Sequence, residues 1–460
     1  MGLAVIVLAA GEGTRMKSSR PKVLHAICGE PMIHFVLKSA AELSPERTIV
    51  IVGHMADTVR AELTGVEFAL QEEQLGTGHA VTQVEQMLEG FAGAVLVLSG
   101  DTPLVTATTL QNLFAVHEKQ GAAASILTAK IDNPTGYGRI IRAGDGTVSA
   151  IVEEKDASNA ERAICEVNSG TYCFNKTKLF DALKRIDSNN AQGELYLTDV
   201  IKVFSNAGET IMASIAPDEN EIMGVNTRVQ LAEADAVMRG RINEQHMLAG
   251  VTIVDPTTTY ISDEAVIGKD TIIYPMTFIS GVTTIGEACI IGPMSRIEDC
   301  TIGNRVVAEN AIVRRSTVED DAALGPFCHV RPATLVKKGA KVGGFVEVKK
   351  SEIGENSKVP HLSYIGDAHI GTSVNIGAGT ITCNYDGANK YQTIIEDEAF
   401  IGSDTMLVAP IKIGKGAFTG AGSVITKDVP EDSLSVERSE QYIINHWARK
   451  RRKKNDVQFD

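Results

Sequence analysis

The sequence predicts two domains of different fold class: an α/β domain with a mostly parallel sheet, then a parallel β-helix. Three observations support this division. The chain has 460 residues, which is long for one domain. Up to about residue 228, short aliphatic runs alternate with helix-like stretches, a pattern typical of βαβ units. After residue 250, aliphatic residues recur every six positions, the period of a parallel β-helix.

The composition is acidic. The chain has 44 basic and 58 acidic residues, a formal net charge of −14, which opposes extended contact with nucleic acid or an anionic membrane. The seven cysteines are scattered singly without a C-x-x-C pair, which favours reduced thiols in a cytoplasm. The apolar start "LAVIVLAA" is too short to span a bilayer and has no basic leader. We therefore expect a cytoplasmic protein with neither a targeting segment nor membrane insertion.

The first domain is expected over residues 1–228. Its strand-like runs are "LAVIVLA", "TIVIVG" and "AVLVLSG", and its helix-like stretches include "PMIHFVLKSAAEL" and "TGHAVTQVEQMLEG". Aliphatic runs of this length, separated by helices, indicate buried strands of a parallel sheet. A long helical pattern follows, and residues 229–250 are expected to form a connecting helix. Its apolar residues are Val229, Leu231, Ala234, Val237, Met238 and Ile242.

The second domain is expected over residues 251–460. In a β-helix each hexad forms one short flat face, and its aliphatic residue points into a shared core. Each buried Ile or Val contributes about 1.5 to 3 kcal/mol. The frame slips after Ile297, and Thr419 is a polar exception in it. The repeating positions are Ile267, Ile273, Ile279, Ile285, Ile291, Ile297, Val318, Leu324, Val330, Val336, Val342, Val348, Ile353, Val359, Ile365, Ile370, Ile376, Ile395, Ile401, Leu407, Ile413 and Ile425.

One segment interrupts the repeats. Residues 383–392, "CNYDGANKYQ", are polar, rich in turn formers and carry no hexad aliphatic. We expect a loop that projects from the coil. Loops on a rigid scaffold are common places for function.

A glycine loop follows the first predicted strand. In "LAAGEGTRM" it can aim backbone N–H groups at phosphate oxygens, with Arg15 and Lys22 supplying charge. Gly11 and Gly13 match the start of G-x-G-x-x-G, but Met16 occupies the third position and no G-K-[ST] follows. A tight strand-to-helix turn therefore explains the loop equally well.

Two polar residues are candidate metal ligands. Asp101 lies just past the end of a predicted strand, where ligands of open α/β sheets bind, and its carboxylate suits Mg²⁺ that bridges phosphates. An ordinary turn aspartate before Pro103 is the alternative. Asn226 can serve at the same site or simply cap the following helix.

The motifs together resemble a known family. They are "LAAGEGTRM", "RPKVLH", "EEQLGTGHA", "SGDTPL", "PTGYGR", "IVEEKDA", "NNAQGELYLTD" and "GVNTR". In order, they resemble those of the bacterial bifunctional N-acetylglucosamine-1-phosphate uridyltransferase / glucosamine-1-phosphate acetyltransferases. The resemblance implies a Rossmann-like nucleotidyltransferase domain followed by a left-handed parallel β-helix of hexapeptide repeats. It also implies a homotrimer that uses glucosamine 1-phosphate, acetyl-CoA, UTP and Mg²⁺ to make UDP-N-acetylglucosamine for the bacterial wall.

For the uridylyl site, the resemblance implies residue roles at matching positions. Nucleotide and phosphates fall to Leu8, Ala9, Ala10, Gly11, Arg15 and Lys22, and uridine to Gln71, Gly76 and Thr77. The implied sugar contacts are Gly138, Glu153 and Asn168. The implied Mg²⁺ ligands are Asp101 and Asn226, and Asn226 is also an implied contact of the nucleotide sugar.

For the acetyl site, the motif "HLSYIGD" resembles the family's H-L-[ST]-Y-x-G-D, which implies that His361 is the general base. Histidine has a pKa suited to accepting the amine proton near pH 7. A lone histidine is otherwise a common surface residue. The resemblance implies that Arg331, Lys349, Tyr364 and Asn375 bind glucosamine 1-phosphate, and that Ala378, Asn384, Tyr385, Ser403, Ala421 and Arg438 bind acetyl-CoA.

Some positions depart from the family pattern. Glu12 places an acid among phosphate binders, and Ser99 replaces the tyrosine of Y-G-D. Gly344 replaces an asparagine, and Pro360 precedes His361 where a small residue is common. Residues 448–454 hold six basic residues, expected to be a solvated end or to lie near CoA phosphates.

Two other functions fit parts of this pattern. One is a sugar nucleotidyltransferase whose repeats are only regulatory, and His361, Tyr364 and the "CNYDG" loop argue against it. The other is a scaffold protein on an inactive nucleotide-binding fold. The joint presence of Arg15, Lys22, Asp101 and Asn226 argues against that function.

Overall fold

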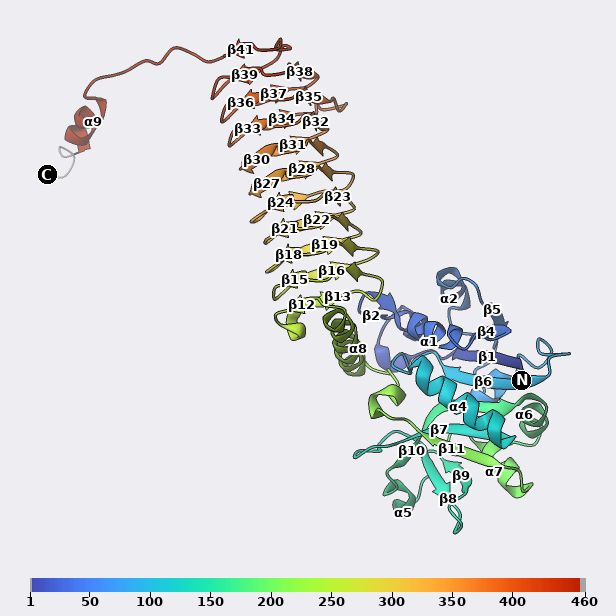
Figure 1. The fold of residues 1–460 in the computed structure, drawn as a ribbon. Coiled ribbons are helices and arrows are strands. Elements are labelled where there is room, and N and C mark those ends of the chain that lie inside the picture. The colour runs from blue at the N-terminus through green and yellow to red at the C-terminus, as the bar shows by residue number, and fades with distance from the viewer. Residues whose placement is uncertain (1, 456–460) are drawn as a thin grey trace. The chain divides into compact units, whose positions relative to one another are not determined.

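The computed structural model describes residues 2–455 (Figure 1). It divides into two compact units, Met1–Ile242 and Asn243–Asp460, and each is described by itself. No helix within the described range is long and apolar enough to cross a bilayer.

The first unit is built on a nine-stranded mixed sheet with the order β11-β7-β10-β6-β1-β4-β5, and a β8–β9 hairpin joined through β10. The strands are β1 (Gly2–Ala9), β4 (Arg47–Val52), β5 (Glu67–Leu70), β6 (Gly93–Ser99), β7 (Ala124–Lys130), β8 (Arg139–Arg142), β9 (Val148–Val152), β10 (Glu166–Asn175) and β11 (Ile211–Ile215). The predicted parallel pairing holds for β1 with β4 and β6. Strand β10 runs antiparallel to both β6 and β7, which the sequence did not indicate.

Both faces of this sheet are covered by helices. They are α1 (Met32–Ala41), α2 (Ala56–Glu62), α3 (Thr77–Thr82), α4 (Ala107–Gln120), α6 (Lys176–Leu183) and α7 (Asp199–Asn206). Within β1, Ala4 and Ile6 belong to one core cluster, with α3, α6 and α7. The alternate residues Leu3, Val5 and Val7 belong to the other, with α1, α2 and α4. Burial on both faces explains why the strands read as unbroken aliphatic runs.

Helix α8 (Arg228–Leu248) covers most of the predicted connecting helix. Its buried residues include Ala234, Met238 and Ile242, whereas Val229 is exposed. The division between the two units falls at residue 242, inside this helix. The boundaries 1–228 and 251–460 therefore stay a prediction.

The second unit is a left-handed parallel β-helix, as predicted. Strands from β12 (Thr252–Ile253) to β41 (Leu434–Ser435) form three parallel sheets of 11, 10 and 9 strands (Figure 1). The predicted hexad residues are buried, from Ile267 to Ile425. The slip after Ile297 arises because some steps between inward positions take five residues, as from Ile297 to the buried Ile302. Figure 1 also shows α9 (Trp447–Asn455) after the last coil; its side chains are exposed as far as Arg452, and those beyond lie outside the described set.

Candidate active sites

The first candidate site lies at the carboxyl ends of two central strands. The loop that begins at Ala10 follows β1, and Asp101 follows the adjacent β6. Parallel neighbours end at the same sheet edge, so these residues come together there. The backbone N–H of Gly100 donates to the carbonyl of Leu8 (2.9 Å), which ties the two strand ends to each other.

Gly13 shapes the glycine loop. Its φ is 64°, in the left-handed region, and an added Cβ would lie 2.6 Å from Cβ of Lys22. The Met16 N–H donates to the Gly13 carbonyl (2.9 Å) and closes the short 3-10 turn Thr14–Met16. A glycine is therefore needed here both for the backbone conformation and for the close approach of Lys22.

Four predicted residues converge on one point. The Lys22 ammonium donates to Oδ2 of Asp101 in a short contact and to Oδ1 of Asn226 (3.0 Å). The Arg15 guanidinium also donates to Oδ1 of Asn226 (3.0 Å). The Asn226 side chain is thus turned toward these cations and does not cap α8. Thr227 caps the helix instead, since its hydroxyl accepts from the Gln230 N–H (3.2 Å) and Gln230 Oε1 accepts from the Thr227 N–H (3.1 Å).

A cavity of about 390 Å³ opens beside this cluster. Its walls include many of the residues that the sequence predicts: Leu8, Ala9, Ala10, Gly11, Lys22, Gln71, Gly76, Thr77 and Asp101. Val23, Gln74, Ala80, Ser99 and Glu194 also line it and were not predicted as contacts. Glu12 lines the cavity as an exposed residue, so its carboxylate keeps access to water.

Gln71, Gly76 and Thr77 form one wall of the cavity. Gln71 is only 3% exposed, and its Nε2 donates to the Gly76 carbonyl (3.1 Å). Gly76 has a φ of 111°, and a Cβ there would lie 2.6 Å from the carbonyl oxygen of Leu195. The Thr77 hydroxyl accepts from the Leu197 N–H (3.0 Å). Residues 194–197 therefore hold this wall in place.

The three predicted sugar contacts form a separate group. A Cβ on Gly138 would lie 3.4 Å from Oε2 of Glu153 and 3.6 Å from Cβ of Asn168, so the three residues are neighbours. Oε1 of Glu153 accepts from the Thr198 hydroxyl (3.1 Å), and burial raises the pKa of Glu153. Glu153 and Thr198 also line a second cavity of about 550 Å³. Thr198 was missed as a site residue, although it belongs to the quoted motif "NNAQGELYLTD".

The second candidate site lies on the β-helix around His361. This residue ends strand β30 (Lys358–His361) and pairs with Gly344 of β27 (Lys341–Gly344) on the preceding coil. His361 is exposed, as expected for a residue outside the aliphatic core. Pro360 precedes it within the strand and does not interrupt the pairing of Val359 with Val342.

The predicted phosphate and sugar contacts lie on two faces of the coil. Lys349 ends β28 (Glu347–Lys349), beside β31 (Tyr364–Gly366), and Arg331 is held there by donating to Glu347 Oε1 (2.7 Å). Asn375 instead pairs with Lys358 in the sheet that contains His361. Each face therefore offers part of the predicted set.

The predicted acetyl-CoA contacts follow successive coils. The Asp404 N–H donates to the Ala378 carbonyl (2.7 Å), and the Gly422 N–H donates to the Ser403 carbonyl (2.8 Å). Arg438 continues the series by donating from Nη1 to the Ala421 carbonyl (3.0 Å). These residues form a column along one edge of the solenoid.

The predicted loop is present between β34 (Ile381–Cys383) and β35 (Thr393–Ile395). Its Asn384 is buried and donates to Asp367 Oδ2 (2.6 Å), whereas Tyr385 is 59% exposed. A Cβ on Gly366 would lie 2.5 Å from the Tyr364 hydroxyl and 2.8 Å from Asn384 Nδ2. The loop therefore begins beside Tyr364, one of the predicted sugar-phosphate contacts.

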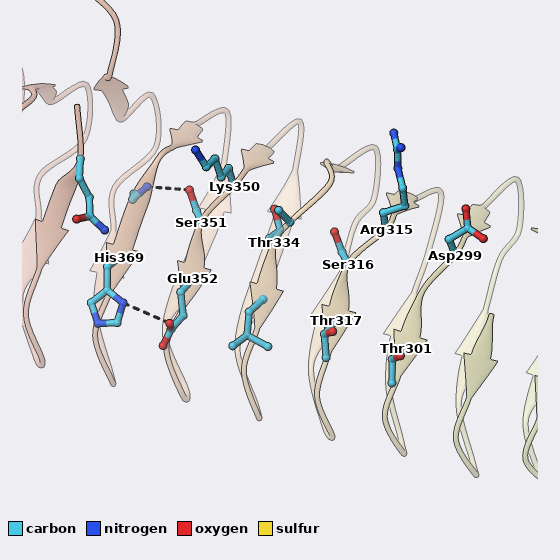
Figure 2. Close-up of a pocket in the computed structure, with 14 residues that line it drawn as sticks. Asp299, Thr301, Arg315, Ser316, Thr317, Thr334, Lys350, Ser351, Glu352 and His369 are labelled. Carbon is cyan, nitrogen blue, oxygen red and sulfur yellow. Dashed lines mark hydrogen bonds and ion pairs between the residues drawn. The ribbon is translucent and has the colours of Figure 1, made fainter. Parts of the chain in front are cut away.

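A long polar groove runs over several coils elsewhere on the β-helix (Figure 2). Figure 2 shows Asp299, Arg315 and Lys350 at the turns, with Glu352 and His369 on the strands. Glu352 Oε2 lies 3.4 Å from Nδ1 of His369. The residues that line this groove do not include His361 or the predicted acetyl-CoA contacts.

Comparison with known proteins identifies the family. A family model described as nucleotidyl transferase matches residues 4–220. A "Bifunctional protein GlmU" from Heliobacterium modesticaldum is 53% identical over 449 residues, 97% of this chain and 98% of the relative. One from Halalkalibacterium halodurans is 51% identical over 447 residues, with the same coverage. The chain therefore belongs to the family of bifunctional GlmU proteins and, as its motifs predict, is a bifunctional transferase that makes UDP-N-acetylglucosamine.

Proposed function

We propose that the two candidate sites divide this synthesis between them. The β-helix site acetylates glucosamine 1-phosphate from acetyl-CoA, and the α/β site then transfers uridylyl from UTP to the product and releases pyrophosphate. The observation that carries the proposal is the convergence of Arg15, Lys22, Asp101 and Asn226 beside a cavity. Two cations and two oxygen ligands at one point match the needs of phosphate chemistry.

In the uridylyl step, a phosphate oxygen of N-acetylglucosamine 1-phosphate attacks the α-phosphorus of UTP, and the bond to pyrophosphate breaks. The attacking oxygen is already anionic, so the step needs no strong base. Lys22 and Arg15 are placed to neutralise charge on the phosphates, and residues 8–11 position the nucleotide. Gly138, Glu153 and Asn168 are the proposed contacts that align the sugar phosphate.

Asp101 and Asn226 fit a Mg²⁺ ion. Both are oxygen donors, as Mg²⁺ prefers, and in the structure both side chains face the same cation, the Lys22 ammonium. Two protein ligands suffice, because Mg²⁺ keeps waters and takes phosphate oxygens. When bound, the ion would neutralise phosphate charge and orient the triphosphate.

In the acetyl step, the amine of glucosamine 1-phosphate attacks the thioester carbonyl, and the bond to CoA sulfur breaks. His361 is proposed to accept the proton that the amine loses, and its exposed position at a strand end leaves room for the substrate. Arg331, Lys349 and Tyr364 are proposed to hold the phosphate, and Asn375 a sugar hydroxyl. The column from Ala378 to Arg438, with Asn384 and Tyr385, is proposed for acetyl-CoA.

The acetyl site is proposed to be completed by other subunits of a homotrimer. Its proposed residues occupy two faces of a coil, and large apolar side chains are exposed on successive turns beside His361, including Phe327 (55%), Phe345 (63%) and Leu362 (62%). Exposed apolar rows of this kind are typical of interfaces. We also propose a cytoplasmic location, testable by fractionation, and domain boundaries at 1–228, 229–250 and 251–460, testable by limited proteolysis.

One assay tests the division of labour. The protein receives glucosamine 1-phosphate with acetyl-CoA in one reaction, where thiol release is measured, and N-acetylglucosamine 1-phosphate with UTP and Mg²⁺ in a second, where pyrophosphate release is measured. We expect His361→Ala to lose thiol release alone, by about 100-fold or more. Asp101→Ala or removal of Mg²⁺ by a chelator is expected to lose most pyrophosphate release alone. Loss of both activities in either variant would contradict two separate sites.

A further inference from the structure

The Gln71 side chain has both of its N–H groups engaged inside the protein. Nε2 lies 3.1 Å from the Gly76 carbonyl oxygen and 3.2 Å from Nδ1 of His79 on α3. An amide nitrogen has two hydrogens, so these two contacts use both. The Gly76 carbonyl can only accept, so it favours the nitrogen end of the amide, and the His79 contact holds the second N–H in the same orientation. Oε1 of Gln71 then remains for a ligand in the cavity that Gln71 lines.

His79 can accept this second hydrogen bond only if Nδ1 carries no proton, so the neutral ring holds its hydrogen on Nε2. The amide nitrogen of Gln83 lies 3.1 Å from that Nε2. A hydrogen bond donated by Gln83 to Nε2 would require the ring hydrogen to be on Nδ1 instead. However, Nε2 of Gln83 also contacts the His79 carbonyl (3.0 Å) and the Thr82 hydroxyl (3.3 Å), which can take both of its hydrogens. Gln71 is 3% exposed, and an unmet hydrogen there costs more than one at the half-buried Gln83. The hydrogen bond from Gln71 therefore determines which ring nitrogen of His79 carries the hydrogen.

We propose that His79 is a positioning residue that keeps the Gln71 amide from donating to the base, so that the cavity presents an acceptor alone. The proposal rests on the proposed role of Gln71 in uridine recognition. An acceptor at this point requires a donor on the base, which the N3–H of uracil supplies. With ribose and phosphates held in the same way, cytosine would place an unprotonated N3 opposite Oε1, and 3-methyluracil would place a methyl group there. Neither base can donate a hydrogen bond to Oε1 from that position. Base selectivity then depends on a residue that does not itself touch the base.

The test compares His79→Leu with His79→Asn. These two side chains have nearly the same shape, but asparagine can offer an oxygen near the position of Nδ1, whereas leucine has no acceptor. The ratio of kcat/KM for UTP to that for CTP is measured by pyrophosphate release, and 3-methyl-UTP is tried with the unaltered protein. Gln83→Leu removes the neighbour on the other side of the ring and serves as the control.

We expect the unaltered protein to reject 3-methyl-UTP by at least about 100-fold, because a buried acceptor would be left unmet. His79→Leu should lower the UTP-to-CTP ratio by about tenfold or more, while His79→Asn and Gln83→Leu stay within about threefold of the unaltered ratio. Melting temperatures of the variants show whether each is folded. If His79→Leu does not fold, the proposal is tested by the 3-methyl-UTP result and by the UTP-to-CTP ratio of His79→Asn.

An unchanged ratio in folded His79→Leu, a fall in His79→Asn as large as that in His79→Leu, or ready use of 3-methyl-UTP would overturn this inference. Each of those results would leave uridylyl transfer itself intact. Failure of the unaltered protein to release pyrophosphate from UTP would instead overturn the proposed uridylyl site.

Discussion

At the residue scale, the uridylyl site depends on a few close approaches that only glycine permits. Gly13 places its backbone in the left-handed region and brings Lys22 within reach of Asp101 and Asn226. Gly76 also has a positive φ, and it lets the wall that contains Gln71 approach the backbone of Leu195. The charged residues thus owe their positions to neighbours that carry no side chain.

Gly13→Ala tests this dependence. An L-residue at φ 64° costs about 1 to 2 kcal/mol, and the new Cβ would press on Lys22. We expect pyrophosphate release to fall by about tenfold or more, with thiol release unchanged. Gly240→Ala in α8 is the control, since its Cβ would meet no atom within 4 Å. Full uridylyl activity in Gly13→Ala would show that the loop tolerates another conformation.

At the element scale, the β-helix is specified by which residue of each short strand points inward. In β18 (Ile290–Ile291), Ile290 is 40% exposed and Ile291 is fully buried. The exception in the hexad frame also has a structural cause: the buried Thr419 hydroxyl accepts from the Gly402 N–H (3.0 Å) and lies 3.3 Å from the Thr405 hydroxyl. A polar side chain is tolerated inside the coil because its hydroxyl is hydrogen-bonded.

Neighbouring substitutions in β18 should therefore differ sharply. Ile291→Ala is expected to lower the unfolding free energy of the β-helix by about 2 to 5 kcal/mol, because it removes buried methyl groups and leaves a cavity. Ile290→Ala, one residue away, should cost less than about 1.5 kcal/mol, since its side chain is already partly in water. Denaturant unfolding measures both. Equal losses would mean that the inward and outward assignments are wrong.

At the scale of the whole molecule, the two activities are expected to depend differently on assembly. The α/β unit holds all its proposed uridylyl residues, and many of them line a cavity within that unit. The proposed acetyl residues are spread over two faces of a narrow solenoid, beside the stacked rings of Phe327 and Phe345, whose centroids are 5.4 Å apart. Subunit contact is thus proposed to matter for one reaction only.

Phe345→Glu should therefore separate the activities. A charge in an apolar contact is strongly unfavourable, so we expect sedimentation to show smaller species, thiol release to fall by about tenfold or more, and pyrophosphate release to persist. Val229→Glu, at an equally exposed position in the first turn of α8, should leave assembly and both activities unchanged. A monomeric unaltered protein with full acetyl transfer would refute the homotrimer.

The sequence by itself determined the two fold classes, the hexad core and the family, because aliphatic periodicity and contiguous motifs are local properties of the chain. It also singled out Arg15, Lys22, Asp101 and Asn226 as candidates. Only the tertiary structure decided that these four side chains meet, since positions up to 211 residues apart are joined there. The antiparallel β10 and the hydrogen bond between Gln71 and His79 were likewise decided by packing. Each depends on which distant backbone or side chain lies opposite, and a linear pattern does not encode that pairing.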